Sequence, residues 1–341
     1  DKKKIYMEVL RNEDWLARQI FGVYKTGQRY YWYTSEAFQI GQKLFKEPNI
    51  EFSPELKEYI EKETEKKAML DAIATKGDVE LDCLIREVTL RPFQKVGVKF
   101  GELADYRMIL ADQMGLGKTI EFIEMALQLE KKLERKAKVL VICPPGLLVN
   151  WTREINRLAG ESPLVLFGME PDKFQLSKLF SLKSGWVLIN YKILSCKKEH
   201  SVIVDTGDGR KLKTQVQDIY PWVEMLNLLN FDITGFDEAH HAKNVESNRS
   251  QAVRKMNPQR VIFMTGTPVL NRPGELWPML TVIDPERFPS YEGFLYTYTI
   301  DNKYPRNTEE LRSTLKDVML RRRKKDVMKD LPPINRMYEW H

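Results

Sequence analysis

The residues best suited to chemistry lie in the glycine-rich turn "ADQMGLGKT", which ends in Lys118 and Thr119. Gly115 and Gly117 allow backbone amides to approach a phosphate group without interference from a Cβ atom. Lys118 supplies a point charge to the outer phosphates, and Thr119 supplies a hydroxyl group to Mg²⁺. The flanking runs "RMILAD" and "KTIEFIEMALQLE" predict the strand and the helix between which such a loop lies. We therefore expect a nucleotide site here, although the strict template has Gly where Asp112 stands.

A second candidate group is the acidic pair Asp237 and Glu238 in "ITGFDEAHH". In a protein with a phosphate loop, the first carboxylate can hold Mg²⁺ and the second can orient or deprotonate the attacking water. Taken alone, two adjacent acids in a basic chain fit a solvated turn equally well. Their place at the end of an apolar strand, in a chain with a phosphate loop, favours the magnesium site. We expect His240 to contact a following motif and His241 to lie on the surface.

The elements that must position these groups are short apolar runs, separated by amphipathic stretches. The runs are "RMILAD", "KVLVIC", "PLVLFG", "GWVLIN", "FDITGFDE" and "RVIFMTG". Continuous apolar strands between helices indicate an α/β fold, in which a parallel sheet is covered by helices on both faces. Ligands of such sheets bind outside the carboxyl ends of the strands, where both candidate groups fall.

Composition sets the outer limits of the interpretation. A chain of 341 residues suits two or three packed units, and 43% hydrophobic with 30% charged residues is typical of a folded globular protein. A net charge of +6 over 341 residues produces only a weak electrostatic field. This excess of basic residues is explained equally well by solubility and by nucleic-acid binding. Cys83, Cys143 and Cys196 suit a reducing compartment and make no zinc spacing with the four histidines, so we expect no zinc. No signal peptide or membrane span is expected.

The N-terminal part lacks the alternation of apolar runs and amphipathic stretches. Residues 1–50 contain "QRYYWYTSEAF", which predicts a strand at Tyr30–Tyr33 and a helix near residues 35–46 in a small aromatic-rich α+β module. The aromatic run fits ordinary packing better than a nucleic-acid stacking platform.

A helical connector is expected over residues 51–85. Ser53 can cap this helix, Pro54 suits its first position and Gly77 can end it. Its interleaved Glu and Lys residues predict a solvated helix.

Two segments depart from the alternation of strands and helices. The run "SVIVDTGDGRKLKTQV" predicts an inserted hairpin near residues 201–216, with its turn at Asp208 and Gly209. The chain beyond residue 283 predicts a helical protrusion over residues 284–333, which contains "LRRRKKDVMKDLPP". The basic run there also fits a solvated helix face or a localisation signal.

The ordered motifs resemble the Swi/Snf family of double-stranded-DNA translocases, within helicase superfamily two. The resemblance covers about residues 88–333 through "LRPFQKVGV", "ADQMGLGKT", "VICPPGLLVNWTREI", "INYKIL", "DEAH", "MTGTPVLNRPGELW" and "VMLRRRKKDV". The sixth and seventh motifs look closest to the annealing-helicase branch. The resemblance implies a RecA-like ATPase lobe over residues 86–283, and residues 334–341 would begin a linker to a second lobe.

The resemblance also implies ATP and Mg²⁺ as cofactors. Gln94 would recognise adenine, Thr119 and Asp237 would hold the metal, and Lys118, Asp237 and Glu238 would be catalytic. His240, Thr265 and Thr267 would couple the nucleotide to DNA. The loop residues that would bind the nucleotide are Asp112, Gln113, Met114, Gly115, Leu116, Gly117, Lys118 and Thr119. Gln113 stands where the family more often has an acid.

The implied partner is double-stranded DNA, bound through its backbone rather than through its base sequence. Arg321 and Arg322 would contact it from the protrusion, and we expect such contacts to depend steeply on salt. Trp151 fits the protein core equally well. The other residues implied along the tracked strand are Pro144, Leu148, Asn150, Trp151, Asn190 and Tyr191.

The motifs of a second lobe, which closes over the nucleotide and supplies arginines, do not occur in this sequence. Because such arginines contribute about 10³–10⁵ in rate, we expect this chain to bind ATP and to hydrolyse it slowly. Alternatives are an RNA helicase of the DEAH type, a nucleotide-gated DNA-binding scaffold and a motor subunit of a restriction complex. The motif "TGTP" argues against the RNA helicase. The expected location is cytoplasmic for a prokaryotic or viral protein and nuclear for a eukaryotic one.

Overall fold

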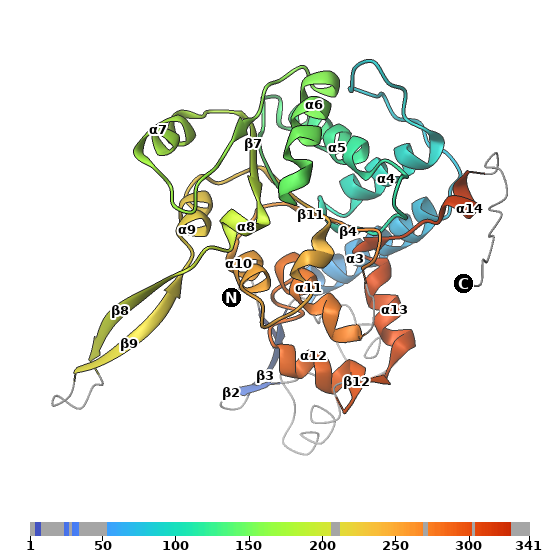
Figure 1. Cartoon of the computed structure of the whole chain (residues 1–341). Helices are drawn as coiled ribbons and strands as arrows, with labels where there is room; N and C mark the ends of the chain where they lie inside the picture. Colours follow the sequence, from blue (N-terminus) through green and yellow to red (C-terminus); the bar gives the residue numbers. More distant parts are fainter. Residues whose placement is uncertain are drawn as a thin grey trace, which may run out of the picture.

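The computed structural model describes three short N-terminal strands and most of the chain after residue 52 (Figure 1). The described residues are 4–7, 24–26, 29–33, 53–205, 212–268, 272–301 and 304–328. The N-terminal strands β1 (Lys4–Met7), β2 (Tyr24–Thr26) and β3 (Arg29–Tyr33) form an antiparallel sheet in the order β1-β3-β2. The predicted aromatic strand is therefore present, whereas the helix expected near residues 35–46 lies outside the described residues.

Helix α3 (Pro54–Ala74) begins where the sequence indicates. The Ser53 hydroxyl accepts a hydrogen bond from the backbone amide of Leu56 at 3.3 Å, and Pro54 occupies the first turn. The helix ends at Ala74, before the Gly77 that we expected to end it. It is also less solvated than expected, because Leu70 and Ile73 are buried in one apolar cluster with residues of helix α4 (Pro92–Leu103).

Within the described residues, seven parallel strands form the central sheet in the order β14-β4-β11-β10-β5-β7-β6. The strands are β4 (Arg107–Leu110), β5 (Lys138–Cys143), β6 (Leu164–Val165), β7 (Gly185–Asn190), β10 (Ile233–Asp237), β11 (Val261–Met264) and β14 (Met319–Leu320). All six apolar runs of the sequence form strands, so the expected α/β fold with a parallel sheet is confirmed.

Helices cover both faces of this sheet, and each face has its own apolar cluster (Figure 1). In β4 the side chain of Ile109 belongs to one cluster, whereas Met108 and Leu110 belong to the other, as the alternation of a strand requires. The helices after the strands are α5 (Lys118–Leu133), α6 (Leu148–Leu158), α7 (Lys173–Ser181), α8 (Tyr191–Leu194), α9 (Pro221–Asn227), α10 (Asn248–Lys255) and α11 (Trp277–Ile283). No helix among the described residues is long and apolar enough to cross a membrane.

The inserted hairpin is present and longer than expected. Strands β8 (Lys198–Asp205) and β9 (Leu212–Ile219) pair in antiparallel fashion and project from the body of the protein (Figure 1). The turn expected at Asp208 and Gly209 lies outside the described residues.

The C-terminal region returns to the sheet instead of remaining a separate protrusion. Helices α12 (Tyr291–Tyr298) and α13 (Thr308–Lys316) flank the short strands β12 (Thr299–Ile300) and β13 (Tyr304–Pro305). Strand β14 then pairs with β4 inside the region assigned to the protrusion, and helix α14 (Lys324–Val327) follows. The region expected to be a protrusion up to residue 333 therefore contains a strand that belongs to the central sheet, and residues 334–341 lie outside the described residues.

The close packing of α5 on β10 generates a prediction about Gly235. A Cβ atom at this position would lie 2.6 Å from Cζ of Phe122, which is fully buried. We expect Gly235→Ala to lower the free energy of unfolding by about 1–3 kcal/mol in urea titrations, because the ring has no free space to enter. Gly77→Ala is the matched control, since nothing lies within 4 Å of the added Cβ atom. Equal stability of the two variants would contradict this packing.

Candidate functional site

The phosphate loop lies between β4 and α5, as its sequence predicts. Gly115 and Gly117 have φ angles of 81° and 90°, a region that residues with a Cβ atom rarely adopt. Helix α5 begins directly at Lys118, so its first amides point toward the space beside the loop. The local backbone therefore provides the cradle of amides that a phosphate group requires.

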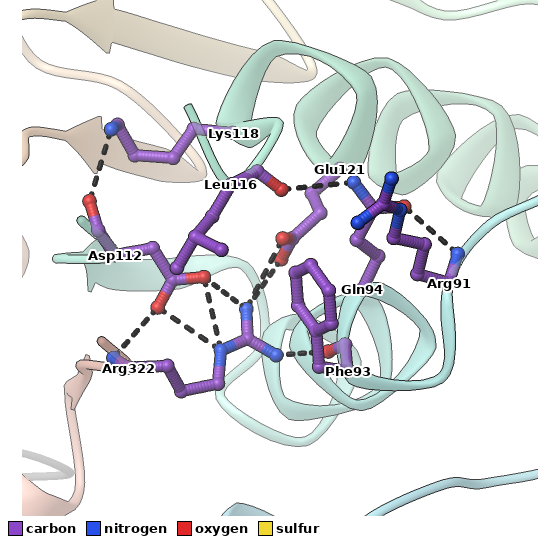
Figure 2. A network of polar contacts seen from close by, with 8 residues as sticks. All are labelled: Arg91, Phe93, Gln94, Asp112, Leu116, Lys118, Glu121 and Arg322. Carbon is purple, nitrogen blue, oxygen red and sulfur yellow. Dashed lines mark hydrogen bonds and ion pairs between the residues drawn. The ribbon is translucent and has the colours of Figure 1, made fainter. Parts of the chain in front are cut away.

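Gln94, on helix α4, holds the phosphate loop at Leu116 (Figure 2). Its side-chain amide donates to the carbonyl of Leu116 at 2.9 Å and accepts from the backbone amide of Arg91 at 2.9 Å. A Cβ atom on Gly117 would collide with this amide. Gln94 is thus in contact with the loop, and its recognition of adenine stays a prediction.

The Lys118 side chain contacts the main chain of Asp112 and not its carboxylate. The buried Lys118 ammonium donates to the Asp112 carbonyl at 3.0 Å, whereas the Asp112 carboxylate turns to the opposite side, toward Arg322. Asp112 can therefore contact a nucleotide only through its main chain. Gln113, Met114 and Gly115 form the exposed tip of the loop. Leu116 and Lys118 are buried, and Gly117 and Thr119 are partly exposed.

The acidic pair lies at the end of β10, next to β11, which in turn adjoins β4. Burial raises the pKa of Asp237 and the charge of Glu238 adds to this, whereas the hydrogen bond from Trp151 and the Lys118 ammonium lower it. The strand order β4-β11-β10 and the close approach of Gly266, after β11, to Met114 bring the two candidate groups to the same edge of the sheet. Oε2 of Glu238 is buried and makes no hydrogen bond of good geometry among the described residues, although Nδ1 of His240 lies 3.2 Å away. This oxygen therefore retains the capacity to accept a hydrogen bond from a bound molecule.

The residues expected to couple the nucleotide to DNA form a continuous series of contacts from Glu238. Nδ1 of His240 lies 3.2 Å from Oε2 of Glu238 and 3.3 Å from the Thr265 hydroxyl. That hydroxyl accepts a hydrogen bond from the Thr267 amide at 3.2 Å. His241 is exposed, as expected, and its ring stacks on that of His240 at 4.7 Å between centroids.

Trp151 does not occupy the DNA-facing position that the resemblance implied. Its side chain is 2% exposed, packs edge-on against Phe122, and donates its indole N–H to Oδ2 of Asp237 at 2.8 Å. No local pattern signals this contact, because the two residues lie 86 positions apart. Trp151 therefore holds the expected metal ligand, and its position in the core corrects the DNA assignment.

The remaining residues assigned to the tracked strand divide into two groups. Asn190 and Tyr191 are buried, and the Asn190 side chain caps α8 by accepting from the Ile193 amide at 3.0 Å. Their buried positions do not fit a direct contact with DNA. Pro144 and Leu148 are partly exposed and Asn150 is exposed, at the start of α6.

Arg322 is the clearest departure from expectation (Figure 2). It is 8% exposed, and its Nε donates to both carboxylate oxygens of Asp112 at 3.0 Å, while Nη2 donates to Glu121 at 2.9 Å. Two buried carboxylates require a cation, so Arg322 is not available to a DNA phosphate in this conformation. Burial raises the pKa of Glu121 despite this partner. Arg321 is exposed, and its expected DNA contact stays a prediction.

Comparison with known proteins decides the family. Residues 93–340 match the family described as the SNF2-related domain. The chain belongs to this family. It is 31% identical over 282 residues to Helicase SWR1 of Candida glabrata, and the alignment covers 75% of this chain and 18% of that protein. It is 28% identical over 258 residues to the human DNA annealing helicase and endonuclease ZRANB3, with 72% of this chain and 21% of that protein covered.

The fold agrees with solved SNF2 structures. The Sulfolobus solfataricus SWI2/SNF2 ATPase core in complex with dsDNA has a TM-score of 0.57 and 27% sequence identity, over 74% of this chain and 48% of that chain. The resemblance to the Swi/Snf family is therefore confirmed, and annealing helicases are among its relatives. The chain spans only about a fifth of the length of the curated SNF2 relatives named above.

The indole contact of Asp237 generates a prediction about metal binding. Trp151→Phe keeps an aromatic ring but removes the hydrogen bond that lowers the pKa of Asp237. The carboxyl group will then retain its proton to higher pH, so Mg²⁺ affinity will begin to fall at a higher pH than in the unsubstituted chain. We expect a loss of about tenfold in affinity where the variant carboxyl group is protonated and the unsubstituted one is not, and a smaller loss at alkaline pH, measured by Mg²⁺ titration in the presence of ADP over a series of pH values.

Trp186→Phe is the control for this experiment. Trp186 is equally buried and also packs against Phe122, but its indole N–H has no partner among the described residues. If both variants change Mg²⁺ affinity by the same factor, the hydrogen bond to Asp237 is not the cause.

Proposed function

We propose that the chain is the ATP-binding lobe of an ATP-dependent motor that moves along double-stranded DNA, of the remodelling, fork-regression or strand-annealing type. One observation carries this proposal: the phosphate loop, the Asp237–Glu238 pair and Thr265 converge at the ends of the adjacent strands β4, β10 and β11. Ligands of parallel sheets bind at this edge. Membership of the SNF2-related family supports the same assignment.

The residues present fit Mg²⁺–ATP. The amides of the loop and the Lys118 ammonium would bind the phosphates, and Gln94 would lie on the adenine side. Thr119 and Asp237 would hold Mg²⁺, which when bound neutralises charge on the phosphates. Glu238, whose Oε2 has only the His240 ring as a polar neighbour within the described residues, would orient the attacking water and accept its proton.

Coupling to DNA would run through the path from Glu238 to Thr267. His240 lies between Glu238 and Thr265, so a change at the outer phosphate would alter the contacts of the motif "TGTP". A Cβ atom on Gly266 would lie 2.8 Å from Cγ of Met114, so this motif also packs against the tip of the phosphate loop.

The proposed track is the backbone of duplex DNA. The Sulfolobus relative is described in complex with dsDNA, and the names of the curated relatives refer to chromatin remodelling and DNA annealing. These names favour a DNA motor over the RNA helicase. On this chain the candidates for contact are Pro144, Leu148 and Asn150 at the start of α6, together with Arg321.

Hydrolysis would require a second lobe. This chain aligns with 48% of the Sulfolobus ATPase core, which supports a partner lobe of similar size. That lobe would supply the arginines that stabilise charge on the transferred phosphate, a contribution of about 10³–10⁵ in rate.

This proposal predicts nucleotide binding without fast turnover. We expect residues 1–341 to bind Mg²⁺–ATP in calorimetry, and Lys118→Ala to weaken this binding by at least about tenfold because the point charge is removed. We expect duplex DNA to leave the slow ATP turnover of this chain nearly unchanged. Strong stimulation by DNA would refute the need for a second lobe, and absence of ATP binding would refute the proposal as a whole.

A second prediction concerns the exposed part of the basic cluster. Because Arg321 and Arg323 are exposed and Arg322 is buried, we expect Arg321→Ala with Arg323→Ala to weaken duplex binding. The slope of log affinity against log salt should fall by about one for each phosphate that an arginine no longer binds. Arg312→Ala, an exposed arginine on α13, is the control. An unchanged slope in the double variant would remove this cluster from the DNA site.

A further inference from the structure

Arg322 occupies the buried space between the phosphate loop and α5, and each nitrogen of its guanidinium has a partner (Figure 2). Nε and Nη2 donate to the Asp112 carboxylate, Nη2 donates to Glu121, and Nη1 donates to the Phe93 carbonyl. Its own backbone amide donates to Oδ1 of Asp112 at 2.9 Å. Helix α4 has a glycine, Gly97, where a Cβ atom would collide with both members of the Arg322–Glu121 pair.

The backbone beside Arg322 continues the pairing of β14 and β4 into the loop itself. The Ala111 amide donates to the Leu320 carbonyl at 2.7 Å, and the Gln113 amide donates to the Arg322 carbonyl at 3.0 Å. The Lys324 amide then donates to the side chain of Gln113 at 2.8 Å. Residues 320–324 therefore form one wall of the phosphate loop.

Two contacts of Arg322 connect it to Lys118 and Gln94, which lie at the proposed nucleotide site. Arg322 binds the Asp112 carboxylate, and the Asp112 carbonyl accepts a hydrogen bond from the Lys118 ammonium. Arg322 also binds the Phe93 carbonyl, and the next residue, Gln94, donates to the Leu116 carbonyl of the loop. Stability alone does not require this arrangement, because apolar residues of similar volume often replace a buried ion pair without loss. The charged network instead selects one conformation of the loop.

We propose that Arg322 is a positioning residue for the nucleotide, which acts by holding the phosphate loop in its binding conformation from the segment 320–324. This inference rests on the proposed function, since it requires that the loop bind ATP. It gives Arg322 a role in nucleotide affinity in place of the DNA contact expected of it, whereas the DNA contact of the exposed Arg321 stays a prediction.

The first test measures nucleotide affinity and thermal stability separately. Arg322→Lys keeps the positive charge but cannot bind Asp112, Glu121 and Phe93 together. We expect its Kd for Mg²⁺–ADP, measured by calorimetry below the melting temperature, to rise about tenfold. Arg312→Lys, at an exposed arginine of α13, is the matched control and should stay within about twofold of the unsubstituted chain.

The outcomes of this test are distinguishable. If Arg322→Lys lowers the melting temperature but leaves the Kd unchanged, Arg322 is merely structural and the inference is overturned. If the unsubstituted chain binds Mg²⁺–ADP no better than Lys118→Ala does, the proposed function fails and this inference fails with it.

The second test uses the unsubstituted chain, so it decides the matter even if Arg322→Lys does not fold. Hydrogen exchange is measured with and without Mg²⁺–ADP. We expect the amides of Gln113, Arg322 and Lys324 to be protected together by at least about fivefold, because they share one hydrogen-bonded wall. Protection of Gly117 and Lys118 without any change at Arg322 and Lys324 would overturn the inference.

Discussion

The proposed nucleotide site depends on the buried ion pair between Asp112 and Arg322, which are 210 positions apart in the chain. The pair joins the phosphate loop to β14, the edge strand of the parallel sheet, and Glu121 extends it to the first turns of α5. Loss of one member of a buried pair typically costs about 3–5 kcal/mol, because the other charge is left without compensation. The conformation of the phosphate loop and the packing of residues 320–324 against it therefore depend on the same ion pair.

A second constraint is the order of the strands. In the run β14-β4-β11-β10, neighbouring parallel strands end at one edge of the sheet, so they deliver the phosphate loop, Thr265 and Asp237 to the same place. Trp151, in the core, orients the Asp237 carboxylate through its indole hydrogen bond. This arrangement explains how motifs that are far apart in the sequence come to lie at one edge of the sheet.

Local patterns in the sequence predict the features that depend on neighbouring residues. The apolar runs, the glycine turn, the Ser53 cap and the hairpin each carry their signal within a few residues, and the structure contains all of them. The DNA contacts predicted for Trp151 and Arg322 do not fit their buried side chains, whose partners are distant in the chain. For Trp151 the structure agrees with the alternative position in the core that the sequence left open. A run of basic residues suggests solvent exposure, yet residues 320–323 alternate between buried and exposed, as a strand does. A helical protrusion would not bury every second residue in this way, so the short strand β14 was missed.

The measurement that tests the account most directly is a double-mutant cycle on Asp112 and Arg322, with the Kd for Mg²⁺–ADP as the observable. We predict that Asp112→Asn and Arg322→Gln each weaken binding, and that the double variant is no weaker than the poorer single variant, because both changes break one interaction. If the two effects simply add, the residues act independently and the ion pair does not hold the loop.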